Sequence, residues 1–313
     1  MNILTEQLLE SIRQFPDQEQ AEINYYLSEI LHLFQRNDEQ FRPGLFRGSV
    51  RRGHFNRVVA GPFATAIITE SANGKLAVPV DDMFVGRQLR FDSGYSIAEL
   101  EYLKTLVDES SQILVVGAHI GSLVVPLCKL VDQCVAVEAN PEIYELLKLN
   151  VKMNEISNCK TYNFAASDRK GTIPFIKNRI NSGGSKRKPL VSSELYSYDD
   201  PSEFQVEAMQ LDSQFPDAHF DLIFMDIEGS EYFALLGMPE LLKNAKMLVM
   251  EFIPHHFTNV AGKDVRELTH ILSDFNSLFI PSKNKLVTRD DIIPLLKLMY
   301  DQNISEDIIV FKK

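Results

Sequence analysis

A glycine-rich turn and three acidic residues each follow a short apolar run in this sequence. The turn is Gly117-Ala118-His119-Ile120-Gly121, and the acids are Glu138, Asp226 and Glu251. In open α/β sheets, ligands bind beyond the carboxyl ends of the strands. Glycine lets the backbone turn tightly and lets a ligand approach the main chain. The pattern therefore predicts a ligand-binding edge where these four features meet.

Glu138 lies about 20 residues beyond the glycine turn, where an acid can accept hydrogen bonds from the hydroxyls of a ribose. Asn140-Pro141 follows it and predicts the start of a helix, because proline is favoured in the first helical turn. A solvated helix cap is the other interpretation of this glutamate. We favour the ribose interpretation because the turn lies upstream and the helix start downstream.

A dense acidic segment, residues 226–231, follows the next apolar strand. Buried charges are costly unless they bind a ligand or cap a helix. For Glu228 and Glu231 in this segment, helix capping is the simpler interpretation. Asp226 instead comes directly at the strand end, where it is a candidate for chemistry.

Asp226, Glu251 and His255 are the candidate catalytic residues, because carboxylates and histidines can remove a proton from a hydroxyl. His256 is a further candidate, and a polar loop is the other interpretation of the histidine pair. Asp226 and Glu251 also form a candidate Mg²⁺ site, since hard cations choose oxygen ligands.

Strand and helix patterns alternate around these residues. Continuous apolar runs of strand length are typical of a parallel sheet buried on both faces. The predicted strands are 113–116, 134–137, 160–164, 220–225, 245–250, 277–280 and 308–311, and the predicted helices are 97–107, 123–131, 142–153, 265–275 and one that begins near 230. Residues 176–204 are expected to form a loop. The alternation predicts a doubly wound α/β sheet with helices on both faces.

The first part of the chain lacks this alternation. Apolar positions spaced three and four apart predict two helices within 3–40, separated at Pro16-Asp17. Residues 41–55 are rich in Arg, Gly and Pro and are expected to form a linker. Asn73-Gly74 between two short apolar runs predicts a β-hairpin.

The chain has 32 basic and 43 acidic residues and a formal charge of −11. Such a protein repels phosphate backbones, so we expect no nucleic-acid partner. The one basic cluster, Lys186-Arg187-Lys188, is interpreted as solvated surface. We identify no signal peptide and no apolar run that could span a membrane, and we expect a cytoplasmic protein without a membrane partner.

The three cysteines, Cys128, Cys134 and Cys159, lie in or beside apolar segments and form no C-x-x-C pair. The sequence therefore predicts neither a disulfide framework nor a zinc site. We expect them to be small core residues.

Several motifs, in order, resemble those of the FkbM-type methyltransferases, a class I S-adenosylmethionine-dependent family. The resemblance covers about residues 95–255, and the matching segments are 115–121, 137–141, 163–168, 211–212 and 226–231. It implies a Rossmann-like class I methyltransferase sheet, preceded here by an N-terminal helical and β-hairpin extension. It also divides the chain into an extension and lid, residues 1–95, and an S-adenosylmethionine-binding domain, residues 96–313.

The resemblance implies a role for each matching position. Glu138 would hold the ribose hydroxyls, and Asp226 would lie under the reacting centre. The other implied cofactor-binding residues are Gly117, His119 and Gly121 along the methionine part, Ala139 beside Glu138, and Asn140, Ala165, Ala166 and Ser167 near the adenine.

Two positions depart from the family pattern. The family usually has Asp where this chain has Val115, and usually Asn where it has His119. Losing the acid removes a possible partner for the amino group of the cofactor. His119 could restore some of that polar contact.

The resemblance implies methylation of a small molecule, and we expect a hydroxyl of a sugar or polyketide-type product. Some members of the family methylate amide nitrogen in peptides, which is the alternative. Residues 41–95 and 176–204 are the expected walls of the substrate site. Residues 3–40 are expected to form a homodimer contact or a cap over the active site.

Three other functions remain open at this point. A nicotinamide-dependent oxidoreductase would also use a Rossmann fold, but the turn lacks the third glycine of G-x-G-x-x-G. A cofactor-binding scaffold without catalysis is compatible with Val115. A nucleic-acid methyltransferase is disfavoured by the charge of −11.

Overall fold

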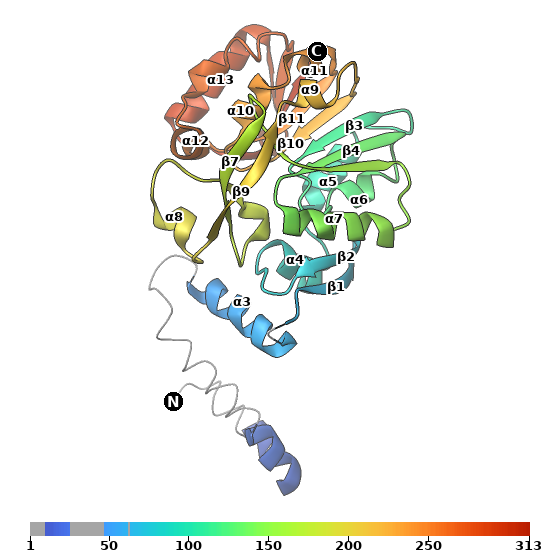
Figure 1. Ribbon diagram of the computed structural model, residues 1–313, viewed down its shortest axis with the longest axis vertical. Coiled ribbons are helices and arrows are strands. Elements are labelled where there is room, and N and C mark those ends of the chain that lie inside the picture. The colour runs from blue at the N-terminus through green and yellow to red at the C-terminus, as the bar shows by residue number, and fades with distance from the viewer. Residues whose placement is uncertain (1–9, 26–46, 62) are drawn as a thin grey trace.

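One mixed eight-stranded sheet forms the centre of the protein, with helices on both faces (Figure 1). The structure is a computed structural model that describes residues 10–25, 47–61 and 63–313. The strand order is β13-β12-β14-β11-β10-β3-β4-β5. In chain order, the strands are β3 Gln112–Val116, β4 Gln133–Glu138, β5 Cys159–Asn163, β10 Leu222–Met225, β11 Met247–Phe252, β12 Ser277–Ile280, β13 Lys285–Thr288 and β14 Glu306–Lys312.

The connections of this sheet confirm the predicted Rossmann-like doubly wound α/β fold. Strands β3, β4, β5, β10 and β11 run parallel, and β14 pairs antiparallel with β11. The chain leaves β3 toward β4 and β5, and later returns to β10 on the other side of β3. Connections diverge at this reversal, so the carboxyl ends of β3 and β10 border a crevice where ligands bind.

The two faces of β3 explain its uninterrupted apolar run. Leu114 and Val116 belong to the core on one face, and Ile113 and Val115 to the core on the other, with all four at most 1% exposed. Helices α5 Ile97–Lys104, α6 Val124–Leu127 and α7 Pro141–Met153 contribute to the second core. Helices α10 Glu231–Leu236, α11 Pro239–Asn244 and α13 Arg289–Asp301 contribute to the first.

The segment before the sheet contains the predicted hairpin. Strands β1 Ala66–Ser71 and β2 Gly74–Pro79 pair antiparallel around Ala72-Asn73, and helix α4 Val85–Phe91 follows. Within 3–40, residues 10–12 and 17–25 are helical and 13–16 are not, in agreement with the predicted break. Residues 1–9 and 26–40 lie outside the described residues.

The predicted linker at 41–55 is wrong from residue 47 onward, because helix α3 Arg47–Ala60 occupies it. Tertiary contacts hold this helix despite two glycines. Gly53 packs so closely on Asp81 and Ile180 that a Cβ there would lie 2.6 Å from an atom of each. Arg57 also forms an ion pair of 2.9 Å with Asp81. Such contacts override weak helix propensity.

The predicted loop at 176–204 is wrong in part, although residues 178–181, 188–193 and 198–201 do lack helix and strand. It contains the end of β7 Gly171–Lys177, the short helices η1 Ser182–Gly184 and α8 Glu194–Ser197, and the strand β8 Lys186–Arg187. With β6 Ala165–Ala166 and β9 Ser202–Met209 these strands form a second sheet, in the order β6-β9-β7-β8. Apolar side chains alternate along β9 and pack against Phe175, but polar residues between them hide the pattern.

The predicted helix at 265–275 is reduced to η3 Val265–Leu268, followed by turns. Its capping box, formed by Asp264 and Glu267, satisfies the backbone of one turn only. The remaining short elements are α9 Leu211–Gln214, α12 Pro254–His256, η2 Phe257–Ala261 and η4 Pro281–Lys283. No helix in the described part of the chain combines the length and apolar character needed to cross a bilayer.

Candidate functional site

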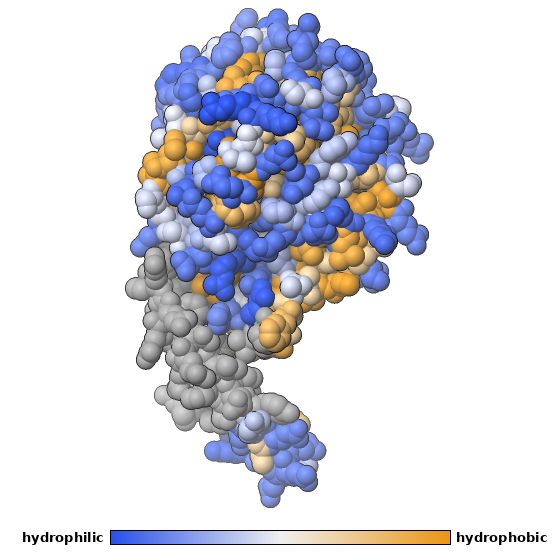
Figure 2. All heavy atoms as spheres, in the orientation of Figure 1, coloured by the Kyte–Doolittle hydropathy of each residue, from blue (hydrophilic) through white to orange (hydrophobic). Residues whose placement is uncertain are grey.

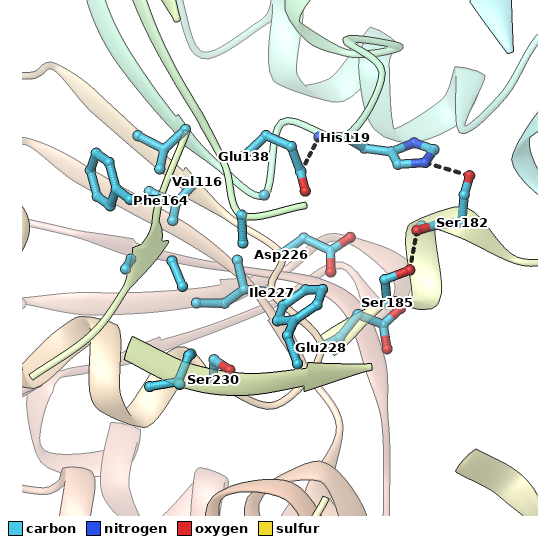
Figure 3. A pocket seen from close by; sticks show the side chains of 18 residues that line it. Val116, His119, Glu138, Phe164, Ser182, Ser185, Asp226, Ile227, Glu228 and Ser230 are labelled. Carbon is cyan, nitrogen blue, oxygen red and sulfur yellow. Dashed lines mark hydrogen bonds between the residues drawn. The ribbon is translucent and has the colours of Figure 1, made fainter. Parts of the chain in front are cut away.

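A cavity opens at the carboxyl ends of β3, β4 and β10 (Figure 3). Polar side chains of Glu138, Asp226 and Glu228 face it from one side. Apolar side chains from β6 and β7 line another side. Seven residues with a predicted cofactor role lie on its wall: Gly117, His119, Glu138, Ala139, Ala165, Ala166 and Asp226.

Backbone N–H groups hold Glu138 at the mouth of the glycine turn. The His119 amide donates to Oε2 at 2.9 Å, and the Asn140 amide donates to Oε1 at 2.7 Å. The side chain is buried, yet its carboxylate faces the cavity (Figure 3). Burial raises the pKa of Glu138 to about 7, against the backbone hydrogen bonds from Asn140, His119 and Ala139, which lower it. Each carboxylate oxygen keeps a lone pair for a further donor.

His119 is fixed by a chain of hydrogen bonds that starts at buried Asp82. Asp82 accepts hydrogen bonds from the Ser182 hydroxyl and amide, so the Ser182 oxygen is an acceptor toward His119 Nε2 at 2.7 Å. His119 therefore carries its proton on Nε2 and keeps a lone pair on Nδ1. Burial lowers the pKa of His119 to about 4, which keeps the ring neutral at neutral pH. Its φ of 49° is unusual for a residue with a Cβ and is typical of functional turns.

The glycine turn brings β3 and β10 closer together than any side chain would permit. Gly117 has a φ of +85°, and a Cβ there would lie 1.8 Å from the backbone oxygen of Asp226. Only glycine satisfies both conditions. The turn thus sets the position of Asp226 as well as its own.

Gly117→Ala is expected to lower the free energy of unfolding by more than about 3 kcal/mol, because strain and a backbone clash add. Chemical denaturation measures this. Gly171→Ala is the matched control, since a Cβ there meets nothing within 4 Å. Equal stability of the two variants would contradict the proposed close approach.

Three residues with a predicted cofactor role lie behind the cavity wall. Asn140 caps α7 by accepting the Glu142 amide and also donates its own amide to Glu138. Ser167 accepts a hydrogen bond from Arg187, and Gly121 packs against Leu147. These contacts support the walls from outside, so a direct cofactor contact from any of the three stays a prediction.

A second cavity adjoins the first, and a third adjoins the second at Phe84 and Asn181. The second shares Gly117, His119 and Asp226 with the first and extends to α4. The third contains the predicted catalytic residue His255, together with Lys186, and is lined further by Phe84, Asn178, Asn181, Gly184, Leu195, Tyr196, Tyr198 and His256. Burial lowers the pKa of His255, which keeps it available as a neutral base.

Asp226 and Glu228 line both the first and the second cavity, and further carboxylates lie near them. Burial, followed by repulsion from Glu228 and other acids, raises the pKa of Asp226 well above its usual range. Burial, followed by repulsion from Asp226, does the same for Glu251. Lys186 lies 2.6 Å from Glu228 and is almost fully buried, so its interpretation as solvated surface is wrong. The half-buried Glu228 carboxylate compensates the charge of this buried ammonium group.

The free energy of unfolding of the ligand-free protein is expected to fall by roughly 2 kcal/mol from pH 6.5 to 8. Burial raises the pKa of Glu138 and Glu231 to about 7, above their values in the unfolded chain. The stability that they contribute is present at low pH and is lost as pH rises through 7. His119, with its pKa lowered to about 4, acts oppositely, but only below its unfolded pKa of 6.5. Denaturant titrations at constant ionic strength check this, and a rise in stability would contradict it.

The structure draws together two groups of residues that could ligate metal, among those it describes. One consists of Glu228, Glu251 and His256. It shares Glu251 with the predicted Mg²⁺ pair but does not include Asp226, so the Asp226–Glu251 pairing stays a prediction.

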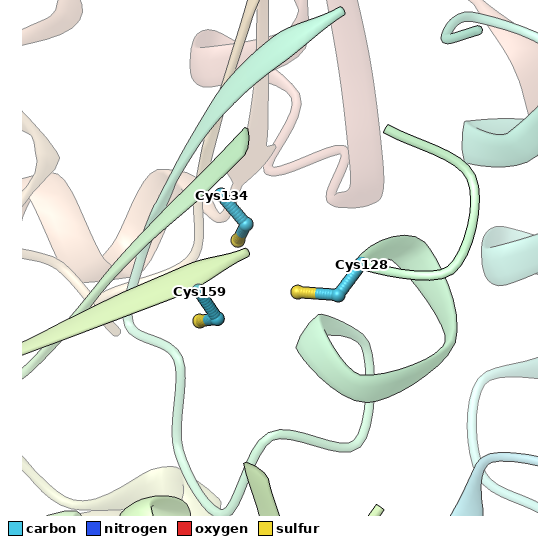
Figure 4. Close-up of side chains that lie close together, drawn as sticks. All are labelled: Cys128, Cys134 and Cys159. Carbon is cyan, nitrogen blue, oxygen red and sulfur yellow. The ribbon is translucent and has the colours of Figure 1, made fainter. Parts of the chain in front are cut away.

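The other group is the three cysteines (Figure 4). Cys134 and Cys159 are register partners near the starts of β4 and β5, and Cys128 follows α6. Cys128 and Cys134 are buried in the core beneath α5 to α7, as predicted. This end of the strands lies opposite the glycine turn, so the thiols are not part of the site.

The residues that sequence analysis missed come from the N-terminal extension and the second sheet. Asp82 and Ser182 are 100 positions apart, and no local pattern connects them. A run of small polar residues at 182–185 was the one available signal, and it reads equally well as a flexible loop. The role of Lys186 required knowledge of the burial around it.

The comparisons with known proteins agree with this geometry. The model of the Methyltransferase FkbM domain family matches residues 116–278, just over half of the chain. No curated protein matches the chain.

Among solved structures, the chain is similar to the FkbM methyltransferase of Methylobacillus flagellatus KT, with 15% identity, coverage of 93% of this chain and 60% of that chain, and a TM-score of 0.39. It is similar to TYW2 of M. jannaschii in complex with AdoMet, with 12% identity, coverage of 79% and 85%, and a TM-score of 0.39. It is also similar to an rRNA methylase of Streptococcus thermophilus, with 9% identity, coverage of 69% and 94%, and a TM-score of 0.39. The family match carries the assignment: the chain has the Rossmann-like fold of class I methyltransferases and belongs to the FkbM methyltransferase family.

Proposed function

We propose that the chain binds S-adenosylmethionine in the cavity beside Glu138 and transfers its methyl group to a hydroxyl of a small molecule. The observation that carries this proposal is the Glu138 carboxylate, which is buried, oriented by two backbone amides and directed into the cavity. A pair of vicinal ribose hydroxyls is the kind of donor that such a carboxylate binds. Family membership decides against the nicotinamide-dependent alternative.

The walls of the cavity fit the other parts of this cofactor. Ala165, Ala166 and Phe175 form an apolar surface that suits a flat base. The neutral Nδ1 of His119 can accept a hydrogen bond where Val115 cannot. On this basis residues 96–313 form the cofactor-binding domain, and α4 of the 1–95 extension acts as a lid over the second cavity.

S-adenosylmethionine supplies an electrophilic methyl group on a positively charged sulfur. The protein must align the acceptor oxygen with that methyl group and remove the hydroxyl proton. Asp226 lies where the first two cavities meet, and His255 lines the third, so both are proposed to accept the proton or position the acceptor. Glu251 is proposed to make Asp226 a stronger base, because the two carboxylates repel each other.

The third cavity supports a sugar or a polyketide-type ring as the acceptor. Phe84, Tyr196 and Tyr198 offer ring faces, while Asn181 and Lys186 offer hydrogen-bond donors. Such a mixture of aromatic faces and donors suits a polyhydroxylated ring. Methylation of a peptide amide is the alternative, since amides use the same donors.

Incubating the protein with methyl-labelled S-adenosylmethionine and two acceptor panels tests the proposal. One panel contains sugars and polyketide-type alcohols, and the other contains peptides with side-chain amides. We expect label in the first panel, released as an O-methyl product. Label in peptides alone would overturn the hydroxyl assignment, and label in neither panel would leave the acceptor class proposed here without support.

A further inference from the structure

An imidazole lies between two carboxylates beside the third cavity. Glu228 lies in the loop after β10, Glu251 lies in β11, and His256 lies in α12. His256 Nε2 is 3.7 Å from Glu228 Oε2, and His256 Nδ1 is 3.8 Å from Glu251 Oε2. Both distances exceed a hydrogen bond. An imidazole gives only one nitrogen to an ion, and one nitrogen of His256 and one oxygen of each carboxylate all lie within 4.8 Å of one another. This spacing suits three ligands of one ion.

The imidazole of His256 lacks the partner that its burial demands. The residue is 5% exposed, and its Nδ1 is buried without a hydrogen-bond partner. A buried polar atom in this state costs about 1–3 kcal/mol and is rare in proteins. A neutral imidazole has one ring nitrogen whose lone pair can bind a metal ion.

Acidic groups outnumber basic groups around His256. Carboxylates of Asp226, Glu228 and Glu251 converge there, and Lys186 supplies one positive charge against them. Buried carboxylates without compensation are expensive. A bound divalent cation would offset the repulsion among these acidic groups.

We propose that Glu228, Glu251 and His256 together bind one divalent transition-metal ion, such as Mn²⁺. Two carboxylates and an imidazole favour Mn²⁺, Fe²⁺ or Zn²⁺ over Mg²⁺, which prefers oxygen ligands alone. The site differs from the Asp226–Glu251 pair in its ligands and in its metal. His256 lines the third cavity, so the ion would help to hold an acceptor there. That role rests on the proposed function, whereas binding of the ion does not.

Titration of the chelator-treated full chain with MnCl₂, followed by the electron paramagnetic resonance signal of free Mn²⁺, tests the site. We expect one Mn²⁺ per chain. Glu251→Gln and His256→Asn should each weaken Mn²⁺ binding by at least about 10-fold. Losing a residue that only orients a metal ligand already costs about 10- to 100-fold in affinity, and losing the ligand itself costs more.

Two control variants should bind Mn²⁺ as the parent does. Glu231→Gln makes the same substitution at another buried glutamate, one that accepts a hydrogen bond from the Ile227 amide. Cys159→Ser removes one thiol of the cysteine group. Circular dichroism confirms folding of every variant, and either ligand variant that folds is sufficient for the test.

Absence of saturable binding would overturn the proposal and leave Lys186 as the resident cation. Binding that survives both ligand substitutions, or that Cys159→Ser abolishes, would overturn it equally. Binding of S-adenosylhomocysteine is measured separately. If the protein binds Mn²⁺ but not S-adenosylhomocysteine, the metal site stands and the proposed cofactor is wrong. If it binds S-adenosylhomocysteine but not Mn²⁺, the cofactor stands and the metal site is wrong.

Discussion

Glu138→Ala is expected to weaken the binding of S-adenosylhomocysteine by about 100-fold. The substitution removes a carboxylate that two backbone amides orient into the cavity. Each of the two hydrogen bonds between the ribose hydroxyls and the carboxylate contributes about 1.5 kcal/mol. Losing both costs about 3 kcal/mol of binding free energy, which corresponds to about 100-fold in affinity. Isothermal titration calorimetry measures the affinity directly.

The pH dependence of that affinity gives a second test of Glu138. Because burial raises the pKa of Glu138 to about 7, the parent should bind more tightly as pH rises through 7 and the carboxylate ionises. The alanine variant should lose that dependence. Glu142→Ala is the control, since its exposed side chain lies outside the cavity wall. Equal losses in the two variants would contradict the ribose assignment.

Asp226→Asn is expected to lower kcat by at least about 100-fold, while changing the affinity for S-adenosylhomocysteine by less than about 3-fold. Loss of a general base typically costs a factor of this size, and asparagine keeps the shape of the side chain. Burial raises the pKa of Asp226, so the rate of the parent should increase with pH as this carboxylate ionises. The asparagine variant should lack that increase.

Steady-state kinetics with the acceptor found in the labelling screen measures the effect of Asp226→Asn. Asp217→Asn is the control, since Asp217 is an exposed turn residue and its φ of 60° suits asparagine. Normal turnover in the Asp226 variant would show that this carboxylate has no catalytic role. Loss of affinity equal to the loss of turnover would assign it to cofactor binding.

The central sheet and half of the site could be predicted from local sequence patterns, namely apolar runs and the acidic residues that follow them. The run at 113–116 is apolar at every position because both faces of β3 are buried. Glu138 and Asp226 follow such runs directly, so their meeting at one edge followed from the parallel order of the strands.

The second sheet and its contribution to the site could not be predicted in this way. Its strands are half-exposed, and β9 alternates apolar with charged residues over a short span. The hydrogen bond from Ser182 to Asp82 connects segments 100 residues apart, and no sequence pattern in either segment indicates that they meet. Lys186 is buried beside Glu228, which is distant in sequence, so their pairing becomes visible only in the folded structure.

A crystal structure of the protein with S-adenosylhomocysteine tests the central claim most directly. We expect both ribose hydroxyls to lie within hydrogen-bond distance of Glu138, the base to pack against Ala165, Ala166 and Phe175, and the sulfur to face Asp226. A ligand bound elsewhere, or bound here with its ribose away from Glu138, would contradict it.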